Sequence, residues 1–430
     1  MLKQLRLLID IINSLGGSST IQNSKAFYDE PPVNFFSGLI HFPYKNRVRG
    51  KGYEVYTQDI VAGGSSFENK ELGILKCAAE LIERICLFTF HPNSIIFKTL
   101  SQMKGNIYVD PKEINGDAKN DGTYGWVKGV DLTDDSTVFV PAQMVYLNYF
   151  AWAKKTHGES QFIQHISNGG CFGFSKESTI IRGIYELIER DSILTKFLGK
   201  VPMPIINTGL ITDSGVKEFR ALMQEYQFLN LVFDATNDLG VPTYFSATID
   251  TSSVVPFATF GAKTSSNKIE AIKGAMEESL MGRTWVRYEL LNRKGTIPKI
   301  NPEKIVTRLD RAFYFADKRN VENLYFLKTP VHSEENFFTV PMKKISDRQE
   351  LSSIVSAMKK KNIRVIVVDI KPAFLKDYPI HIYKVIIPDL QYLYLEEPGK
   401  IINKKRVEDV RSFFAIQKNL KLETAPHFLL

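Results

Sequence analysis

Several familiar signatures are missing from this sequence of 430 residues. It holds only three cysteines and no C-x-x-C pair, which excludes a disulfide framework or a cysteine-rich zinc site and is typical of a reducing cytoplasm. It also has no run of about 18 apolar residues, so we expect neither a membrane-spanning helix nor a membrane partner. These absences predict a cytoplasmic protein.

Common phosphate-binding and hydrolytic motifs are absent too. Neither G-x-x-x-x-G-K-[ST] nor G-x-G-x-x-G occurs, which excludes a P-loop and a dinucleotide-binding turn. None of the seven histidines forms an H-x-H or H-E-x-x-H pair, and no Ser-His-Asp constellation is recognisable. The net charge is +8, but the basic residues are dispersed, so we do not expect nucleic-acid binding.

The residues that are present, 44% hydrophobic and 24% charged, suffice for a large core. The opening MLKQLRLLIDIINSLGG predicts an amphipathic helix rather than a signal peptide. Further along we expect strands at Ile363–Ile370 and His381–Ile387 and a helix around Gly215–Gln224. The predicted fold class is α+β, with mixed helices and sheets built from repeated units.

The repeat is clearest in the pentapeptide ELIER, which occurs at Glu80–Arg84 and again at Glu186–Arg190. The flanking residues align as well, because residues 63–90 and 169–196 match without a gap and both open with Gly-Gly. Each copy therefore has one plan. A glycine-rich loop, in which glycine permits positive φ, opens a helix with apolar residues on one face and acids on the other.

A weaker third copy begins at Gly261. Glu278 takes the place of Glu80 there. Arg283 lies one residue past the place of Arg84. The sequence therefore predicts three glutamate-bearing helices.

Two interpretations of the polar faces are open. On a solvated helix, Glu80 and Arg84 would be an ordinary i, i+4 pair worth about 0.2–0.5 kcal/mol. However, Glu80 and Glu83 are three apart, where like charges repel, and the second helix repeats this choice. A divalent hard cation removes that cost, and magnesium prefers carboxylate and phosphate oxygens. We therefore favour a site for magnesium and polyphosphate, in which arginines hold phosphate oxygens.

In this order along the chain, the stretches resemble the YcaO family, whose ATP site is assembled from three glutamate-bearing helices. ILKCAAELIER looks like the family's first A-x-x-E-x-x-E-R helix. SNGGCFGFSKESTIIRGIYELIERDS is similar to its most diagnostic stretch, and FGAKTSSNKIEAIKGAMEESLMGR to its third helix. VFDATNDLGVPTYFSATID and KVIIPDLQYLY also fit, so the resemblance covers the chain from about residue 50 to the end.

The resemblance implies ATP and Mg²⁺ as cofactors and assigns roles to individual residues. The implied magnesium ligands are Glu80, Glu83, Glu186 and Glu189. The implied ATP-binding residues are Ser167, Asn168, Arg84, Arg190, Glu278 and Arg283.

Two departures from the family pattern concern the reaction. Met281 stands where the third helix of the family usually carries a glutamine. The family's azoline-forming members often end in a proline-rich tail, whereas the last residues here are TAPHFLL. In this tail we expect His427 as a candidate catalytic proton-transfer group.

The family chemistry implies an ATP-dependent cyclodehydratase that phosphorylates a backbone amide oxygen. A Cys, Ser or Thr side chain of a ribosomally made precursor peptide adds to the amide carbon and yields a thiazoline or oxazoline, as in peptide antibiotics of the bacteriocin type. Thioamide or amidine formation by the same fold remains an alternative. A non-catalytic scaffold subunit of a peptide-modifying complex is a third one.

We divide the chain into an N-terminal helical segment, residues 1–50, and a YcaO domain, residues 51–430. The first segment is too short for a leader-binding domain, so we expect a separate ThiF/E1-like partner to bind the leader of the precursor peptide. A flavin dehydrogenase is a further candidate partner, and we expect a homodimer within the complex.

Overall fold

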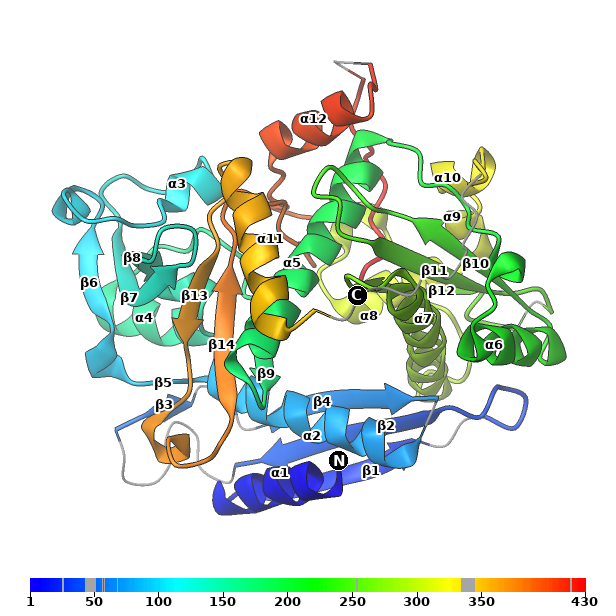
Figure 1. Ribbon diagram of the computed structural model, residues 1–430, viewed down its shortest axis with the longest axis horizontal. Helices are drawn as coiled ribbons and strands as arrows, with labels where there is room; N and C mark the ends of the chain where they lie inside the picture. Colours follow the sequence, from blue (N-terminus) through cyan, green and yellow to red (C-terminus); the bar gives the residue numbers. More distant parts are fainter. Residues whose placement is uncertain are drawn as a thin grey trace. The chain divides into compact units, whose positions relative to one another are not determined.

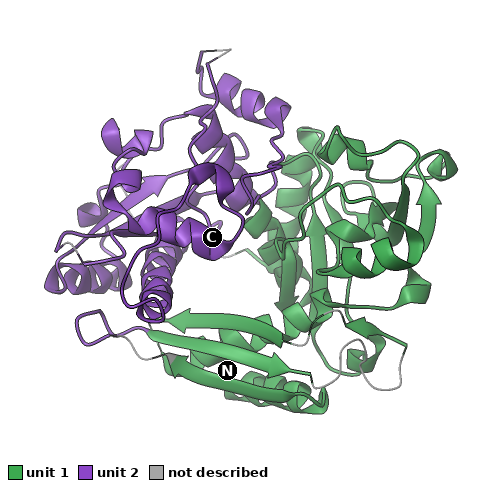
Figure 2. Ribbon diagram, turned by 180° about the vertical axis from the view of Figure 1, so that it is seen from behind, with its two compact units in different colours: residues 1–24, 34–187, 345–390 green, residues 25–33, 188–344, 391–430 purple. Residues whose placement is uncertain are grey.

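The computed structural model describes the chain except for residues 25–26, 43–51, 56, 58, 68, 253, 334–344 and 418–419. The chain divides into two compact units, each assembled from three stretches of sequence (Figure 2). Unit 1 comprises Met1–Ser24, Asn34–Leu187 and Ile345–Leu390. Unit 2 comprises Lys25–Val33, Ile188–Lys344 and Gln391–Leu430.

Unit 1 begins with a small antiparallel sheet in the order β1-β2-β4, covered on one face by helix α2, which also contacts α1 (Figure 1). Strand alternation buries Ile40 and Ile60 towards the helix and leaves Leu39 and Val61 exposed. Helix α2 begins after Asn69, whose Oδ1 accepts a hydrogen bond from the backbone of the first turn. The bounds are α1 Leu2–Ser14, β1 Ser18–Ser24, β2 Asn34–His41, β4 Asp59–Ser66 and α2 Lys70–Leu87.

The larger sheet of unit 1 joins strands from distant parts of the sequence. Its order is β6-β7-β13-β14-β9, with β8 paired to β7. Two late strands therefore lie between two early ones, and β9 and β14 also contact helix α2. The bounds are β6 Ile96–Thr99, β7 Thr123–Asp131, β8 Ser136–Pro141, β9 Gly170–Gly173, β13 Ile366–Asp369 and β14 His381–Ile386.

The remaining elements of unit 1 are short, apart from α11. A two-stranded ladder pairs β3 with β5. The bounds are β3 Glu54–Val55, β5 Thr89–Phe90, α3 Pro111–Ile114, α4 Tyr149–His157 and α11 Asp347–Lys360. The 3₁₀ turns of this unit are Pro92–Ser94, Ser101–Met103, Ala142–Met144 and Ala373–Leu375.

Helix α5, Lys176–Gly199, follows β9 and passes through the division between the units after Leu187. Unit 2 contains an antiparallel sheet in the order β10-β11-β12, against which the long helix α7 packs. The principal bounds are β10 Phe228–Asp234, β11 Thr243–Asp250, β12 Ala258–Thr264 and α7 Lys268–Leu291. The other helices are α6 Ser214–Glu225, α8 Arg308–Ala316, α9 Lys318–Val321, α10 Tyr325–Lys328 and α12 Lys404–Phe413, with 3₁₀ turns at Thr208–Leu210 and Pro302–Lys304.

The elements predicted from the sequence are present, with shifted ends. The helix around Gly215–Gln224 is α6, and the strand at His381–Ile387 is β14. The strand expected at Ile363–Ile370 is only Ile366–Asp369, because Arg364 leaves the ladder to donate its N–H to an aspartate.

The first fifty residues differ more from the expectation of a helical segment. Only Leu2–Ser14 is helical, and β1 and β2 follow it. Strand β2 pairs with β4 along its whole length, so one sheet crosses the division expected at residue 50. The reason lies in the tertiary structure, because β2 packs against helix α2, which comes later in the chain.

Membrane and redox expectations can be compared with the described residues. None of the helices among them is long and apolar enough to cross a membrane. Cys77, Cys86 and Cys171 are all buried and carry free thiols.

Glycine lets strand β4 approach helix α2 closely. A Cβ built on Gly64 would lie 2.4 Å from both Cys77 N and Gly73 O, which are backbone atoms that cannot move aside. The third copy repeats this, since a Cβ on Gly261 would lie 2.1 Å from Ser279 N in α7. The glycine-rich loops expected before the first and third helices are therefore strands, β4 and β12, in which glycine is needed for close contact with the helix.

Gly64→Ala should therefore destabilise the protein by roughly 1–3 kcal/mol or more, because the strand and helix must separate to admit the methyl group. Urea denaturation measures the loss. Gly116→Ala is the matched control, since a Cβ at Gly116 meets no atom within 4 Å. Equal unfolding midpoints for the two variants would contradict the prediction.

Candidate active site

The glutamate that opens the repeated motif on each of the three helices is tied to the backbone that precedes the helix. In every case Oε2 accepts a hydrogen bond from a backbone N–H. The pairs are Glu80 with Gly63 N at 2.9 Å, Glu186 with Gly169 N at 3.0 Å, and Glu278 with Ala262 N at 3.0 Å. Such a bond fixes the direction of the carboxylate. The repeat seen in the sequence is therefore also a repeat of side-chain geometry.

In unit 1 two acids converge on one glycine pair. Glu186 accepts the N–H of Gly169, and a Cβ built on Gly170 would lie 3.2 Å from Glu83 Oε1. Gly169 has a φ of +81°, and its own Cβ would lie 2.2 Å from Val385 O. Only glycine fits here.

The turn that carries Ser167 and Asn168 is held at both ends. Gly170 N donates to Ser167 O at 2.8 Å, and Val385 N donates to Gly169 O at 2.7 Å. Asn168 is 8% exposed, and its Nδ2 has no hydrogen-bond partner among the residues that the structure describes. A buried amide donor without a protein partner is available to an acceptor on a ligand or a water molecule.

Arg84 lies along its own helix. Its Nε and Nη2 lie 2.8 Å and 2.7 Å from Glu80 Oε1. The i, i+4 pair is therefore present, but Glu80 also binds Gly63, so this face is more than a solvated surface.

Lys384 is a site residue that the sequence argument did not single out. It lies on β14 opposite Gly170, is 3% exposed, and its Nζ donates to Ile166 O at 3.0 Å. The signal was a lysine inside the apolar run HIYKVII, where an unpaired charge is costly.

Burial and charge shift the pKa values in this cluster. Burial, followed by the charges of Glu186 and Glu80, raises the pKa of Glu83 to about 8. Burial lowers the pKa of Lys384 to about 8, although Glu186 and Glu83 oppose the change. Glu83 therefore keeps a proton below about pH 8 in the metal-free cluster, and a cation that binds this carboxylate must displace the proton.

In unit 2 two glutamates accept hydrogen bonds from backbone N–H groups along the free edge of strand β12. Glu189 Oε2 accepts from Thr264 N at 2.9 Å, and Glu278 accepts from Ala262 N, two residues earlier. Strand β12 is at the edge of its sheet, so these N–H groups lack a partner strand. N–H groups two residues apart point the same way at a separation of roughly 7 Å, so the strand brings both carboxylates together.

Arg190 and His427 lie near each other in unit 2. Arg190 Nη1 is 3.6 Å from Glu189 Oε1. His427 is fully buried, with Nε2 2.6 Å from Tyr394 O. Burial, then Arg311, holds the pKa of His427 well below its ordinary value, and Arg190 contributes. This placement does not support a proton-transfer role for His427, because substrate has no access to the ring.

The tail is packed into unit 2 through aromatic contacts. Phe428 is 1% exposed and lies among other phenylalanine rings. The rings whose centroids lie 4.7–5.8 Å from it belong to Phe197, Phe245, Phe260 and Phe326.

The phosphate contact expected of Arg283 is not supported. Its guanidinium is 1% exposed and donates to Glu30, Asp250 and the backbone oxygen of Pro256. The physical reason is helical rotation. Arg283 lies one residue past the place of Arg84, and one residue turns the side chain by about 100°.

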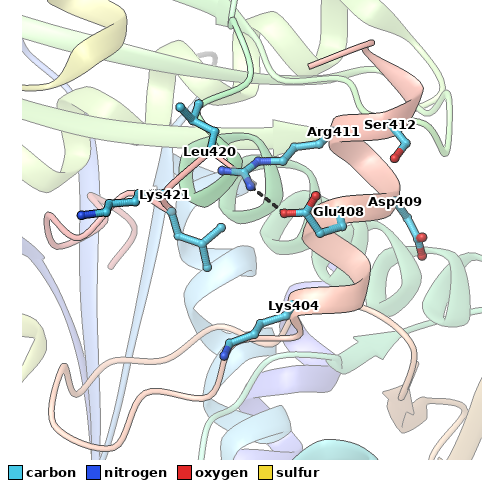
Figure 3. A pocket seen from close by; sticks show the side chains of 8 residues that line it. Lys404, Glu408, Asp409, Arg411, Ser412, Leu420 and Lys421 are labelled. Atoms are coloured by element: carbon cyan, nitrogen blue, oxygen red, sulfur yellow. Dashed lines mark hydrogen bonds and ion pairs between the residues drawn. The ribbon is translucent and has the colours of Figure 1, made fainter. Parts of the chain in front are cut away.

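A hollow of about 700 Å³ lies beside α12 (Figure 3). Glu408 pairs with Arg411 inside it, which neutralises the buried guanidinium. None of the predicted site residues lines it. The lining residues are Lys404, Glu408, Asp409, Arg411, Ser412, Leu420, Lys421 and Leu422.

The donors in unit 1 fit a magnesium nucleotide. Among the described residues, no group of three or more His, Cys, Asp or Glu side chains could hold a metal ion alone. Magnesium usually takes one or two carboxylates and completes its shell with phosphate oxygens and water. The site in unit 1 meets that description. It has two converging carboxylates, a buried amide donor without a partner among the described residues, and two glycines at which a side chain would not fit.

A comparison with family models identifies the family of the chain. The model described as "YcaO cyclodehydratase, ATP-ad Mg2+-binding" matches residues 70–391. The chain belongs to the YcaO family. The predicted family, fold class and cofactors, ATP and Mg²⁺, are thereby confirmed. The comparison with curated proteins gives no match.

Solved structures show the same YcaO fold at low sequence identity. A heterocyclase in complex with substrate and cofactor matches with a TM-score of 0.73 and 15% identity, over 99% of this chain and 57% of that one. The heterocyclase TruD gives 0.59 and 18%, over 84% and 52%. YcaO from Methanopyrus kandleri, bound with AMPPCP and Mg²⁺, gives 0.63 and 15%, over 93% of both chains. This chain therefore spans just over half the length of the first two.

The raised pKa of Glu83 predicts a pH dependence of stability. Between pH 4.5 and about 8, folded metal-free protein keeps a proton on Glu83 that the unfolded chain has lost. The free energy of unfolding therefore falls as pH rises through this window. Glu83→Gln should be more stable than the unchanged protein at pH 8, by on the order of 1–3 kcal/mol, and no more stable below pH 5.

Urea denaturation at several pH values in EDTA provides the measurement. The matched control is Glu71→Gln, an exposed position in the first turn of the same helix. Parallel pH profiles for Glu83→Gln and the unchanged protein would show that Glu83 has an ordinary pKa.

Proposed function

We propose that this protein is an ATP-dependent cyclodehydratase that forms thiazolines or oxazolines from Cys, Ser or Thr residues of a ribosomally made precursor peptide. The observation that carries the proposal is the set of carboxylates anchored by backbone N–H groups on three repeated helices. Membership of a family described as cyclodehydratase supports it.

In unit 1, Glu83 and Glu186 would hold magnesium, because they converge on one turn. Asn168 would donate its free amide hydrogen to a phosphate oxygen, and Ser167 belongs to the same turn. When bound, magnesium ATP supplies the phosphoryl group that converts the amide oxygen into a leaving group. The protein contributes position and charge, which is the main requirement of phosphoryl transfer.

The other predicted ligands keep their proposed roles. Glu80 and Glu189 are held by backbone N–H groups in a fixed direction, which suits metal ligation. Arg84, Arg190 and Glu278 would contribute to nucleotide binding. Arg283 and His427 are left out because each is buried in contacts of its own unit.

We also propose a partner that binds the leader of the precursor peptide. Two matched structures are the E. coli microcin synthetase McbBCD complex, alone and with pro-MccB17 bound. A leader-binding partner of the ThiF/E1 type, a flavin dehydrogenase and a homodimer remain predictions. So does the cytoplasmic location.

Thioamide or amidine formation is the second candidate. The observation that favours it is the burial of the stretch from Pro426 to Leu429, which packs among phenylalanine rings and so is not free to reach a substrate. Mass spectrometry of the product separates the reactions, because an azoline has lost water and a thioamide has exchanged oxygen for sulfur.

Glu189→Gln should abolish ring formation while the fold is retained. Glutamine keeps an oxygen that can accept the N–H of Thr264, but it loses the charge. We expect turnover to fall on the order of 100-fold, equivalent to about 3 kcal/mol of transition-state stabilisation. The assay is mass spectrometry of precursor peptide incubated with the partner protein and magnesium ATP.

Glu177→Gln is the control on the same helix, three turns earlier and outside the acid clusters. Circular dichroism checks that both variants are folded. Full azoline formation by Glu189→Gln would favour the solvated-helix interpretation. Failure of the unchanged protein to bind magnesium AMPPCP in the presence of its partner would favour a scaffold.

A further inference from the structure

Lys384 is a buried cation in the acid cluster of unit 1. It lies in an apolar strand with 3% of its surface exposed, yet fully buried lysines are rare unless they have a charged partner. The acids of the same cluster are Glu186, which accepts the N–H of Gly169, and Glu83, whose Oε1 lies beside Gly170, the residue paired with Lys384. Neither acid forms an ion pair of 4.0 Å or less with it in the described part of the chain. The ammonium group therefore lies in the acid cluster without forming a close ion pair with either carboxylate.

The same side chain holds the turn that presents Asn168. Lys384 Nζ donates to Ile166 O, just before the turn, and the N–H of Val385 holds Gly169 O at its end. Strand β14 therefore holds the turn at both ends, through the side chain of Lys384 and the backbone of Val385. The N–H of Gly169 remains available to Glu186, so the clamp also sets the position of that carboxylate.

We propose that Lys384 is a positioning residue, which clamps the turn from Ile166 to Gly170 and serves as the built-in counter-ion of Glu186, the acid bound to that turn, before a divalent cation binds. A cation that binds the two acids then adds positive charge beside the ammonium group. Lys384 therefore stabilises the empty site and weakens binding of the free metal ion. Only this second consequence rests on the proposed function.

The first experiment is a double-mutant cycle in metal-free protein. Lys384→Met keeps the length of the side chain and removes the charge and the donor. We expect it to lower the melting temperature by on the order of 5 °C, because breaking a buried charge arrangement on one side leaves the other charge uncompensated. Glu186→Gln alone should also lower it. Lys384→Met with Glu186→Gln should be more stable than Lys384→Met alone, because no uncompensated charge then remains.

Lys128→Met is the matched control, since Lys128 is an exposed lysine in β7 of the same sheet. Strict additivity of the two substitutions, or a Lys384→Met variant as stable as Lys128→Met, would overturn the counter-ion assignment. This experiment contains no metal or nucleotide, so its outcome does not depend on the proposed function.

The second experiment titrates Mg²⁺ alone and follows the melting temperature and the heat of binding. Lys384→Met should bind the free ion about tenfold more tightly, because a positive charge within the acid cluster has been removed. An unchanged or weaker midpoint would contradict the competition between lysine and metal. If the unchanged protein shows no response to Mg²⁺, the proposed metal site fails, and the double-mutant cycle still decides the role of Lys384.

Discussion

The arrangement of the site depends on one repeated contact, in which a glutamate accepts a hydrogen bond from a backbone N–H. The N–H group belongs to an edge strand or a glycine turn, where no partner strand competes for it. The bond aims the carboxylate, so a flexible side chain takes a fixed direction. Glu80, Glu186 and Glu278 all make this contact.

The contact requires helix and backbone to come unusually close, and glycine provides the distance. Gly64 and Gly261 lie against helix backbone, and Gly169 lies against a strand carbonyl. Two of these glycines lie in strands and one in a turn. They therefore serve packing, and the close packing sets the position of the carboxylates.

An acid cluster without a bound cation must be stabilised by other means. Protonation of Glu83 and the buried ammonium group of Lys384 both reduce its net negative charge. Each of these must be overcome or balanced when a metal ion binds, which couples metal affinity to pH and to one buried lysine. The same groups therefore influence stability, metal binding and the position of Asn168.

The sequence by itself determined the repeat, the helices that carry it, the family and the cofactors. These depend on local periodicity and on residue spacing, and Glu80, Glu186 and Glu278 occupy equivalent places as a result. Tertiary structure alone decided which donors are free. Arg283 lies one residue past the place of Arg84, and its guanidinium forms ion pairs with Glu30 and Asp250 instead. His427 is buried by its aromatic neighbours, and Lys384 reaches the acids only because β14 pairs with β9. Such contacts join residues from 33 to more than 200 positions apart, and no local pattern encodes them.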